Sequence, residues 1–377
     1  MNRVPFYYTP DERLFVIADG PEVFVYSGQK DTPVWKGFAD GILVGVAATG
    51  DRVFAADADG RLVTFKVIDA SKIGEHHTDR PAFSLAFDHA TATVGLVGED
   101  GLLLSDGENA GRSFLMPGAR FAAFAEGKVA IATEKGRLEV FDVATGQSLG
   151  RAEVAGPVAG IAWRPQYEEW VVAAGENAVF LSADLKKVES QILVRALDAD
   201  EKPQPGALGP VAIDVEGALL AVVIDQQIAI FELFENKRVG TIRFQRVVSG
   251  VGFGKGTWLA IGLDDAEGNR VELSTGQLKK TEPFGGRSGG RWPMQVTINH
   301  ALLKQGMTYL KAQGKPIAVA APKPKAVTAG GAAAAATSGW GVGRIIAILA
   351  VLIFGCTGCS AVLGVAWAWW AGVFGPM

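Results

Sequence analysis

Short apolar stretches alternate with polar turns along roughly the first 280 residues, and the pattern recurs about every 38 to 40 residues. Each copy has a short apolar stretch, a turn, a run of small residues, a second turn, an alternating stretch and a polar exit. Seven copies begin near Pro5, Ile42, Ala82, Arg120, Val158, Val211 and Val248. Three short strands, with a fourth in the variable exit, are typical of a propeller blade. We predict an all-β, seven-bladed β-propeller, with six or eight blades as alternatives.

Glycines mark the hairpins predicted inside each copy. Asp-Gly pairs supply the positive φ that a two-residue hairpin turn needs. Such pairs end at Gly20, Gly60 and Gly101, and Gly136 and Gly268 are predicted to act in the same way. Strands near the propeller axis should be buried on both faces and therefore rich in Ala, Gly and Val. Residues 54–58, 171–175 and 259–263 have that composition.

The chain changes character after the repeats. We place the propeller at residues 1–287, a linker and amphipathic helix at 288–313, a disordered tether at 314–340 and a membrane anchor at 341–377. The helix is predicted at residues 301–312 with Asn299 as its N-cap. Its apolar stripe packs back on the propeller or, alternatively, binds a partner. The tether is rich in Ala, Pro, Lys and Gly and cannot bury enough apolar surface to order itself.

The last 33 residues, 345–377, contain no charged side chain. About 20 apolar residues are enough to span the hydrocarbon core of a bilayer. Residues 345–366 therefore predict a single C-terminal transmembrane helix. Basic and aromatic side chains mark the membrane interfaces. The predicted anchor comprises Arg344 at the near interface, Ile345, Leu349 and Leu352 in the span, and Trp367, Trp369 and Trp370 at the far interface.

The charges around the anchor predict its orientation. The N-terminus has no apolar run of signal-peptide length, and eight basic residues but no acidic ones follow Glu282. By the positive-inside rule this flank stays in the cytoplasm. We predict a single-pass, tail-anchored protein whose propeller faces the cytoplasm. The basic stretch contacts anionic lipid or serves as a solvated linker.

The propeller itself is acidic. Subtracting the eight basic residues after Glu282 from the total of 36 leaves 28 against 40 acidic ones in residues 1–282, a net charge of −12. Nucleic-acid binding needs clustered Lys and Arg, so no nucleic-acid partner is predicted. In the anchor, small residues lie on one side of the predicted helix and permit self-association: Gly355, Gly358, Ser360 and Gly364.

Three stretches resemble parts of WD-repeat proteins. Residues 77–87 are similar to the junction in which a Gly-His turn precedes a strand ending in an aromatic residue, and residues 136–149 and 156–165 are similar to later parts of that unit. Phe141 with Asp142, and Phe231 with Glu232, occupy the place of the Trp-Asp pair. The resemblance covers about 280 residues and implies a propeller that binds other proteins.

No fragment of the sequence predicts catalytic, cofactor or metal chemistry. Residues 250–257 resemble a phosphate loop but lack its spacing. Glu75, His76 and His77 are adjacent on an extended chain, so their side chains point to opposite sides. The acidic turns near Asp57 and Asp264 lack the alternating oxygen ligands of a calcium loop. We therefore predict a protein that is not an enzyme and has no cofactor and no metal.

These observations favour a membrane-tethered, non-catalytic scaffold that binds an unknown protein partner. The alternative is an enzyme or small-molecule sensor that uses the central channel of the propeller. About a dozen extra residues around 197–206 separate the fifth and sixth copies and should protrude from one face. We predict that this loop docks a basic partner through Asp198, Asp200 and Glu201.

Overall fold

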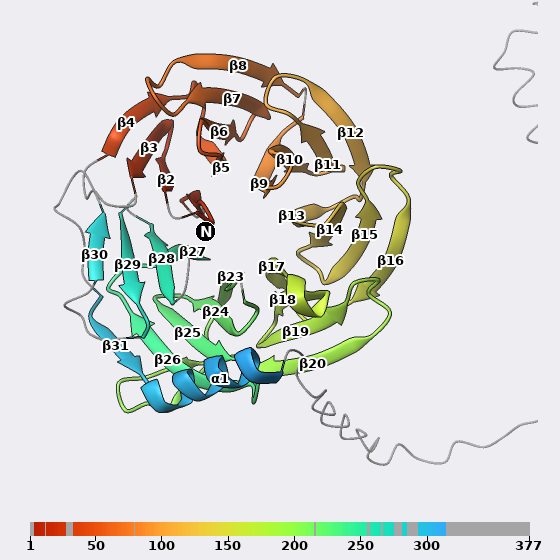
Figure 1. Ribbon diagram of the computed structural model, residues 1–377. Coiled ribbons are helices and arrows are strands. Elements are labelled where there is room, and N and C mark those ends of the chain that lie inside the picture. Colours follow the sequence, from red (N-terminus) through yellow and green to blue (C-terminus); the bar gives the residue numbers. More distant parts are fainter. Residues whose placement is uncertain are drawn as a thin grey trace, which may run out of the picture. The chain divides into compact units, whose positions relative to one another are not determined.

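Seven sheets surround one axis in the computed structural model, as Figure 1 shows. The structure describes residues 4–11, 13–27, 33–78, 80–214, 216–254, 257–264, 267–274, 281–284 and 293–313. The chain divides into two compact units, Met1–Ala321 and Pro322–Met377, and all described residues belong to the first unit. The fold is an all-β, seven-bladed β-propeller, as predicted. The predicted tether and anchor lie outside the described residues.

Each blade is built from four consecutive antiparallel strands, with the first next to the axis. Blades 1 and 2 contain β1 (Phe6–Tyr8), β2 (Leu14–Asp19), β3 (Glu22–Ser27), β4 (Pro33–Phe38), β5 (Leu43–Ala48), β6 (Arg52–Asp57), β7 (Arg61–Lys66) and β8 (Lys72–His77). Blades 3 and 4 contain β9 (Ala82–Asp88), β10 (Thr93–Gly98), β11 (Gly101–Ser105), β12 (Ala110–Leu115), β13 (Ala119–Ala125), β14 (Lys128–Thr133), β15 (Arg137–Asp142) and β16 (Ser148–Glu153).

The remaining blades follow in chain order. Blade 5 contains β17 (Val158–Arg164), β18 (Glu169–Ala174), β19 (Asn177–Ser182) and β20 (Val188–Leu193), with a 3-10 turn, η1 (Pro165–Tyr167). Blade 6 contains β23 (Leu208–Ile213), β24 (Leu219–Ile224), β25 (Gln227–Glu232) and β26 (Lys237–Arg243), and blade 7 contains β27 (Val248–Phe253), β28 (Trp258–Leu263), β29 (Gly268–Glu272) and β30 (Thr281–Phe284). The additional elements are β21 (Ala196–Leu197), β22 (Pro203–Gln204), β31 (Gln295–Ile298) and α1 (His300–Gln313).

The strands that are buried on both faces are the second strands, not the axial ones. The small-residue runs at 54–58, 171–175 and 259–263 lie in or at the ends of β6, β18 and β28. Axial strands such as β13 are only half-buried. An axial strand pairs with one neighbour and borders the axis, whereas a second strand has a strand on each side and a blade against each face. The small-residue runs therefore lie in the second strand of their blades, the position that they hold in the sequence repeat, one strand out from the axis.

Four of the five predicted glycine turns are present. Gly20, Gly60, Gly101 and Gly136 all have positive φ, between 59° and 141°. Gly268 is instead the first residue of β29, where it pairs with Gly262 of β28 and does not have a positive φ. A Cβ on Gly268 would come within 2.5 Å of the ring of Phe15 in blade 1, so this glycine allows two blades to approach closely. Its prediction as a turn residue was wrong.

The ring closes by side-chain packing between blade 7 and blade 1. Among the described strands, no four-stranded blade contains strands from both ends of the chain. Phe6 of β1 lies against Gly250 and Gly262 of blade 7, where added Cβ atoms would come within 2.5 and 2.8 Å of its ring. Phe6 meets the fully buried Phe15 edge to face, with ring centroids 4.7 Å apart. Aromatic rings in glycine-lined space therefore form this seam.

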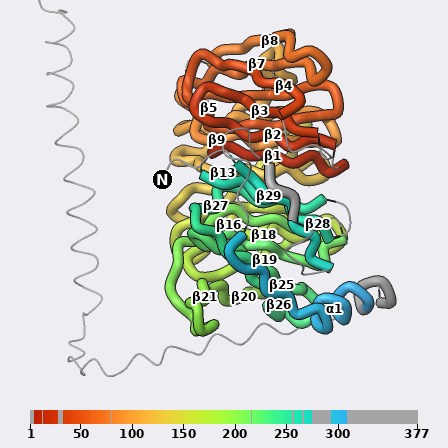
Figure 2. The backbone as a smooth tube through the Cα atoms, turned by 90° about the vertical axis from the view of Figure 1, so that its left-hand side faces the viewer, coloured from red at the N-terminus to blue at the C-terminus, as the bar shows by residue number. Residues whose placement is uncertain are grey.

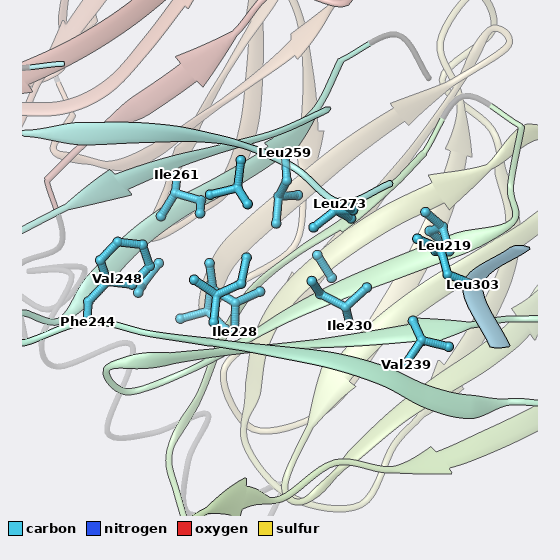
Figure 3. Packing of buried hydrophobic residues seen from close by; sticks show 14 of the residues in the cluster. Leu219, Ile228, Ile230, Val239, Phe244, Val248, Leu259, Ile261, Leu273 and Leu303 are labelled. Atoms are coloured by element: carbon cyan, nitrogen blue, oxygen red, sulfur yellow. The ribbon is translucent and has the colours of Figure 1, made fainter. Parts of the chain in front are cut away.

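The chain returns to blade 6 after completing blade 7. β31 pairs with β26 and makes the sheet of blade 6 five-stranded, so part of the segment predicted as a linker extends this blade. α1 begins beside Asn299, whose side-chain oxygen accepts a hydrogen bond from Leu302 N at 3.2 Å. Figure 3 shows Leu303 of α1 beside the core shared by blades 6 and 7. The helix and its packing against the propeller agree with the expectation from its apolar stripe.

The propeller has two distinct faces at blade 6. We call the face with the turns between second and third strands, such as Gly60 and Gly136, the hairpin face; it also carries β21 and β22. The opposite helix face carries α1 and the turns between first and second strands, such as Glu126 and Glu168. Figure 2 shows β21 and α1 on opposite sides of the ring.

Within the described part of the chain, no helix has the length and hydropathy needed to span a bilayer.

Candidate partner-binding site

The loop predicted to protrude between blades 5 and 6 forms a small hairpin on the hairpin face. Ala196 pairs with Gln204 and Leu197 pairs with Pro203, so β21 and β22 form a short antiparallel ladder. The tip turns tightly, because Asp198 N donates to Lys202 O at 3.0 Å. Glu201 has a φ of 62° within this turn. We refer to residues 196–204 as the acidic hairpin.

Polar side chains of blade 6 fix the acidic hairpin to the sheet. Gln227 binds both main-chain groups of Leu197: its Oε1 accepts from Leu197 N at 3.0 Å and its Nε2 donates to Leu197 O at 2.6 Å. Arg243 donates from Nη2 to Leu197 O at 3.0 Å and also to Asp198 O. Arg238 donates from Nη1 to Arg195 O at 2.6 Å. The hairpin is therefore held in one orientation by β25 and β26.

Two arginines, Arg238 and Arg243, lie beneath the acidic hairpin. Arg238 is half-buried, and burial, together with repulsion from Arg243, lowers the pKa of Arg238 to about 10. The Arg238 guanidinium still favours the charged form at neutral pH. Two positive charges pointing at main-chain carbonyl groups hold the base of the hairpin, while the acidic side chains lie at its tip.

The three predicted docking residues have different roles. The Asp198 carboxylate accepts hydrogen bonds from Asp200 N and Lys202 N, each at 2.9 Å, and from Gln204 Nε2 at 3.2 Å. The bond from Lys202 N is the largest reason why the pKa of Asp198 is lowered. Asp200 and Glu201 are exposed at the tip, where Lys202 Nζ lies 3.6 Å from Asp200 Oδ2. Asp198 therefore shapes the turn, and the other two residues present negative charge.

A second polar cluster lies on the helix face between blades 5 and 6, and sequence reasoning missed it. Arg164, at the end of β17, is buried and donates from Nε to Gly217 O at 2.8 Å and from Nη1 to Glu169 Oε2 at 3.0 Å. Its guanidinium carbon lies 3.6 Å from the centroid of the Tyr167 ring. Asp214, also buried, accepts from Ala218 N and Leu219 N at 2.6 Å. We call Arg164, Tyr167, Glu169 and Asp214 the polar clamp.

Burial dominates the pKa values in the polar clamp. It raises the pKa of Asp214 to about 6, against the lowering effect of its two backbone hydrogen bonds. Burial also raises the pKa of Glu169 and lowers that of Arg164, while each residue's charge opposes the shift of the other. Asp214 Oδ2, Arg164 Nη2 and Tyr167 Oη are buried atoms that have no hydrogen-bond partner among the described residues. Nothing in the local sequence signals this cluster, because Arg164 and Asp214 are 50 residues apart.

The axial strands carry few charged side chains. Across the seven described axial strands the charged side chains are Asp88, Arg120 and Arg164. Arg120 stacks on Phe83, with its guanidinium carbon 3.6 Å from the ring centroid. The described residues contain no group of three or more His, Cys, Asp or Glu side chains that could hold a metal ion. The walls around the axis are therefore mainly apolar and aromatic.

Comparison with known proteins supports the fold alone. The sequence matches no known protein family and no curated protein. The structure is similar to the β-propeller domain of Cps50 (Swd1) from Myceliophteria thermophila, with a TM-score of 0.57 and 13% identity over 71% of this chain and 94% of that one. It is also similar to hydrazine synthase from Kuenenia stuttgartiensis, with a TM-score of 0.64 and 11% identity over 72% and 95% of the two chains. At these identities the likeness is one of architecture.

Proposed function

We propose that this protein is a membrane-tethered, non-catalytic scaffold whose propeller binds a basic protein partner on the cytoplasmic side. The observation that carries the proposal is the acidic hairpin, which Gln227, Arg238 and Arg243 hold in one orientation. A preorganised loop loses little conformational entropy on binding. Its exposed tip presents Asp200 and Glu201 to a partner. The similarity in fold to the Cps50 propeller is consistent with a scaffold.

Charge supports the choice of a basic partner. The first 282 residues carry a net charge of −12, and an acidic surface accelerates encounters with basic proteins. Such steering weakens as salt is added, because the Debye length falls from about 10 Å at 0.1 M to about 3 Å at 1 M. Partner capture should therefore decrease as ionic strength rises.

The experiment compares two charge-removing pairs. Full-length protein carrying Asp200→Asn and Glu201→Gln is compared with protein carrying Glu126→Gln and Glu168→Gln, two exposed acids on the helix face. Affinity purification in mild detergent, followed by quantification of the captured proteins, should show a selective loss for the hairpin pair. Equal capture by both variants and the wild type would remove the acidic hairpin from the proposal. Asp198 is left intact because it shapes the turn.

The membrane part of the proposal rests on the sequence of residues 344–377. We infer that Ile345, Leu349, Leu352 and the tryptophans at 367, 369 and 370 form a single span, with Arg344 at its cytoplasmic end. Replacing Leu349 and Leu352 by Arg should release the protein into the soluble fraction, because each charge at the bilayer centre costs about 2.5 to 3.5 kcal/mol. Wild-type protein in the soluble fraction after cell breakage would contradict the anchor. Protease accessibility in intact and opened vesicles would test the orientation.

The polar clamp supports the second candidate, an enzyme or small-molecule sensor. The polar clamp contains four ionisable groups with shifted pKa values, close to one another between blades 5 and 6. Clusters of this kind are often found at functional sites. The likeness to hydrazine synthase shows that the architecture also occurs in an enzyme. A metabolite that raises the melting temperature of the wild type, but not of Glu169→Gln, would favour this candidate. Such a result together with salt-independent partner capture would replace the scaffold proposal.

A further inference from the structure

A groove lies between blades 2 and 3 and opens on the hairpin face. Its volume is about 500 Å³, and its walls come from the end of β8 and from β10, β11 and β12. The floor is apolar, because the buried side chains of Leu96, Leu102 and Phe114 line it. At the rim, Leu115 is 74% exposed. An exposed leucine beside a concave apolar floor is suited to receive an apolar side chain.

The groove is bordered by two strand edges. β8 and β12 are the outermost strands of their sheets, so each has one edge without a strand partner among the described residues. His76 and His77 of β8 and Ala110 and Ser113 of β12 line the space between them. An extended peptide can use main-chain hydrogen bonds along such an edge while its side chains enter adjacent pockets. The shape therefore favours an extended segment over a folded surface.

The charge around the mouth is negative. Arg80 is paired with Asp100 at 2.7 Å, and the Glu99 carboxylate also lines the groove. The same face carries an acidic residue in the turn between the second and third strands of blades 2 to 7: Asp59, Asp100, Glu134, Glu176, Asp225 and Asp264. Two of these residues are ion-paired, Asp100 with Arg80 and Glu176 with Arg195. A segment approaching the groove over this face meets a negative field, which favours lysine and arginine around the inserted side chain.

We propose that this groove binds an extended peptide segment in which one apolar side chain is flanked by lysine or arginine. The apolar side chain occupies the space above Leu102 and Phe114, and the basic residues lie over Glu99 and the neighbouring acidic turns. The inference rests on the proposed function in that the protein binds other proteins. It gives the hairpin face a second contact site, across the ring from the acidic hairpin of blade 6.

The test uses purified full-length protein and fluorescein-labelled nine-residue peptides. One peptide has a central leucine flanked on each side by two lysines; a second replaces the leucine by serine, and a third replaces the lysines by glutamates. Fluorescence polarisation should show at least tenfold tighter binding of the first peptide. Equal affinity for all three peptides, preference for the glutamate peptide, or no binding to folded protein would each overturn the proposal.

Variants locate the binding. Ala110→Trp should fill the groove from the exposed strand β12, and Leu115→Ser should remove the apolar rim; each should weaken the lysine-leucine peptide about tenfold. The matched control is Ile68→Ser, because Ile68 is 88% exposed in the β7–β8 turn on the helix face. Binding that survives both groove variants, or is lost equally in the control, would contradict the site. Peptide affinity is measured without a cellular partner, so its failure is distinguishable from failure of the acidic hairpin.

Discussion

The seam between blades 7 and 1 and the junction between blades 5 and 6 occupy equivalent positions in the ring but are built differently. At the seam, Phe6 and Phe15 fill space opened by Gly250, Gly262 and Gly268. At the other junction, the polar clamp joins the blades through the hydrogen bond from Arg164 to Gly217 O. Propeller geometry therefore requires contact between neighbouring blades without prescribing its chemistry.

The seam and the polar clamp are stabilised by different interactions. The seam gains stability from buried apolar area and close packing, which respond weakly to pH. In the polar clamp, hydrogen bonds and ion pairing offset the free-energy cost of burying charged groups. Removing one member of the pair leaves the charge of the other buried without compensation. We expect the seam to respond mainly to changes in volume and the polar clamp to respond mainly to changes in charge and pH.

Truncation at the seam should have the largest effect. Phe15→Ala removes a fully buried ring that packs against Phe6, Tyr26 and Gly268, so unfolding free energy should fall by about 4 kcal/mol. Urea denaturation of the full-length protein in detergent would measure the loss. Phe38→Ala is the matched control, because Phe38 is 66% exposed and should change stability by less than about 0.5 kcal/mol. Similar losses for both variants would contradict a specific role for the seam.

Breaking the polar clamp should be the next most destabilising change. Arg164→Leu leaves the half-buried Glu169 without its partner, and the unfolding free energy should fall by about 3 kcal/mol. The double variant Arg164→Leu with Glu169→Leu should recover part of that loss, because no unpaired carboxylate remains. If the double variant loses more unfolding free energy than the two single variants lose together, the cost of an unpaired buried charge does not explain the loss.

Asp214 should make the polar clamp depend on pH. Its pKa is about 6 in the folded protein and 3.8 in an unstructured peptide, so the folded state binds the proton more tightly. This contribution is fully present below about pH 3.8 and is lost as pH rises through 6. Asp214→Asn can accept the same backbone hydrogen bonds but cannot ionise. The variant should therefore exceed the wild type in unfolding free energy by about 2 kcal/mol at pH 8.

The corresponding measurement pairs wild type and Asp214→Asn at pH 8 and pH 4. The advantage of the variant should largely disappear at pH 4, where Asp214 of the folded wild type is protonated. Taking the difference between the two proteins cancels the titration of the other carboxylates. An advantage that is the same at both pH values would show that Asp214 does not carry this pH dependence.

Overpacking the seam should have the smallest effect of the series. An added methyl group in Gly262→Ala would lie 2.8 Å from the Phe6 ring, which must then move. We expect a loss of about 1 kcal/mol in unfolding free energy. Gly50→Ala is the control, because a Cβ there meets no atom within 4 Å. Equal melting temperatures for Gly262→Ala and the wild type would mean that the seam accommodates an added methyl group without strain.

The difference between local repeats and contacts across blades also explains how much of the molecule could be predicted from sequence. Blade order and number follow from a local repeat, and predicted starts at Ala82, Val158 and Val248 coincide with the first residues of β9, β17 and β27. Relations between blades are not local. The contact of Gly268 with Phe15, and of Gly217 with Arg164, joins residues far apart in the chain. The protruding loop was visible as an excess of residues, but its attachment through Gln227 and Arg243 was not.

The way the ring closes, by packing of side chains and not by a blade with strands from both ends of the chain, has a consequence for folding during synthesis. Because the first four strands of each blade come from one stretch of chain, a blade has these four strands available as soon as that stretch leaves the ribosome, and β31 alone joins its blade later. Blade 1 does not have to wait, with an open sheet edge, for a strand synthesised hundreds of residues later. Nascent blades can form one after another, from N-terminus to C-terminus. The aromatic seam is then the contact that must await blade 7, and β31 follows it as the last strand laid down on the ring.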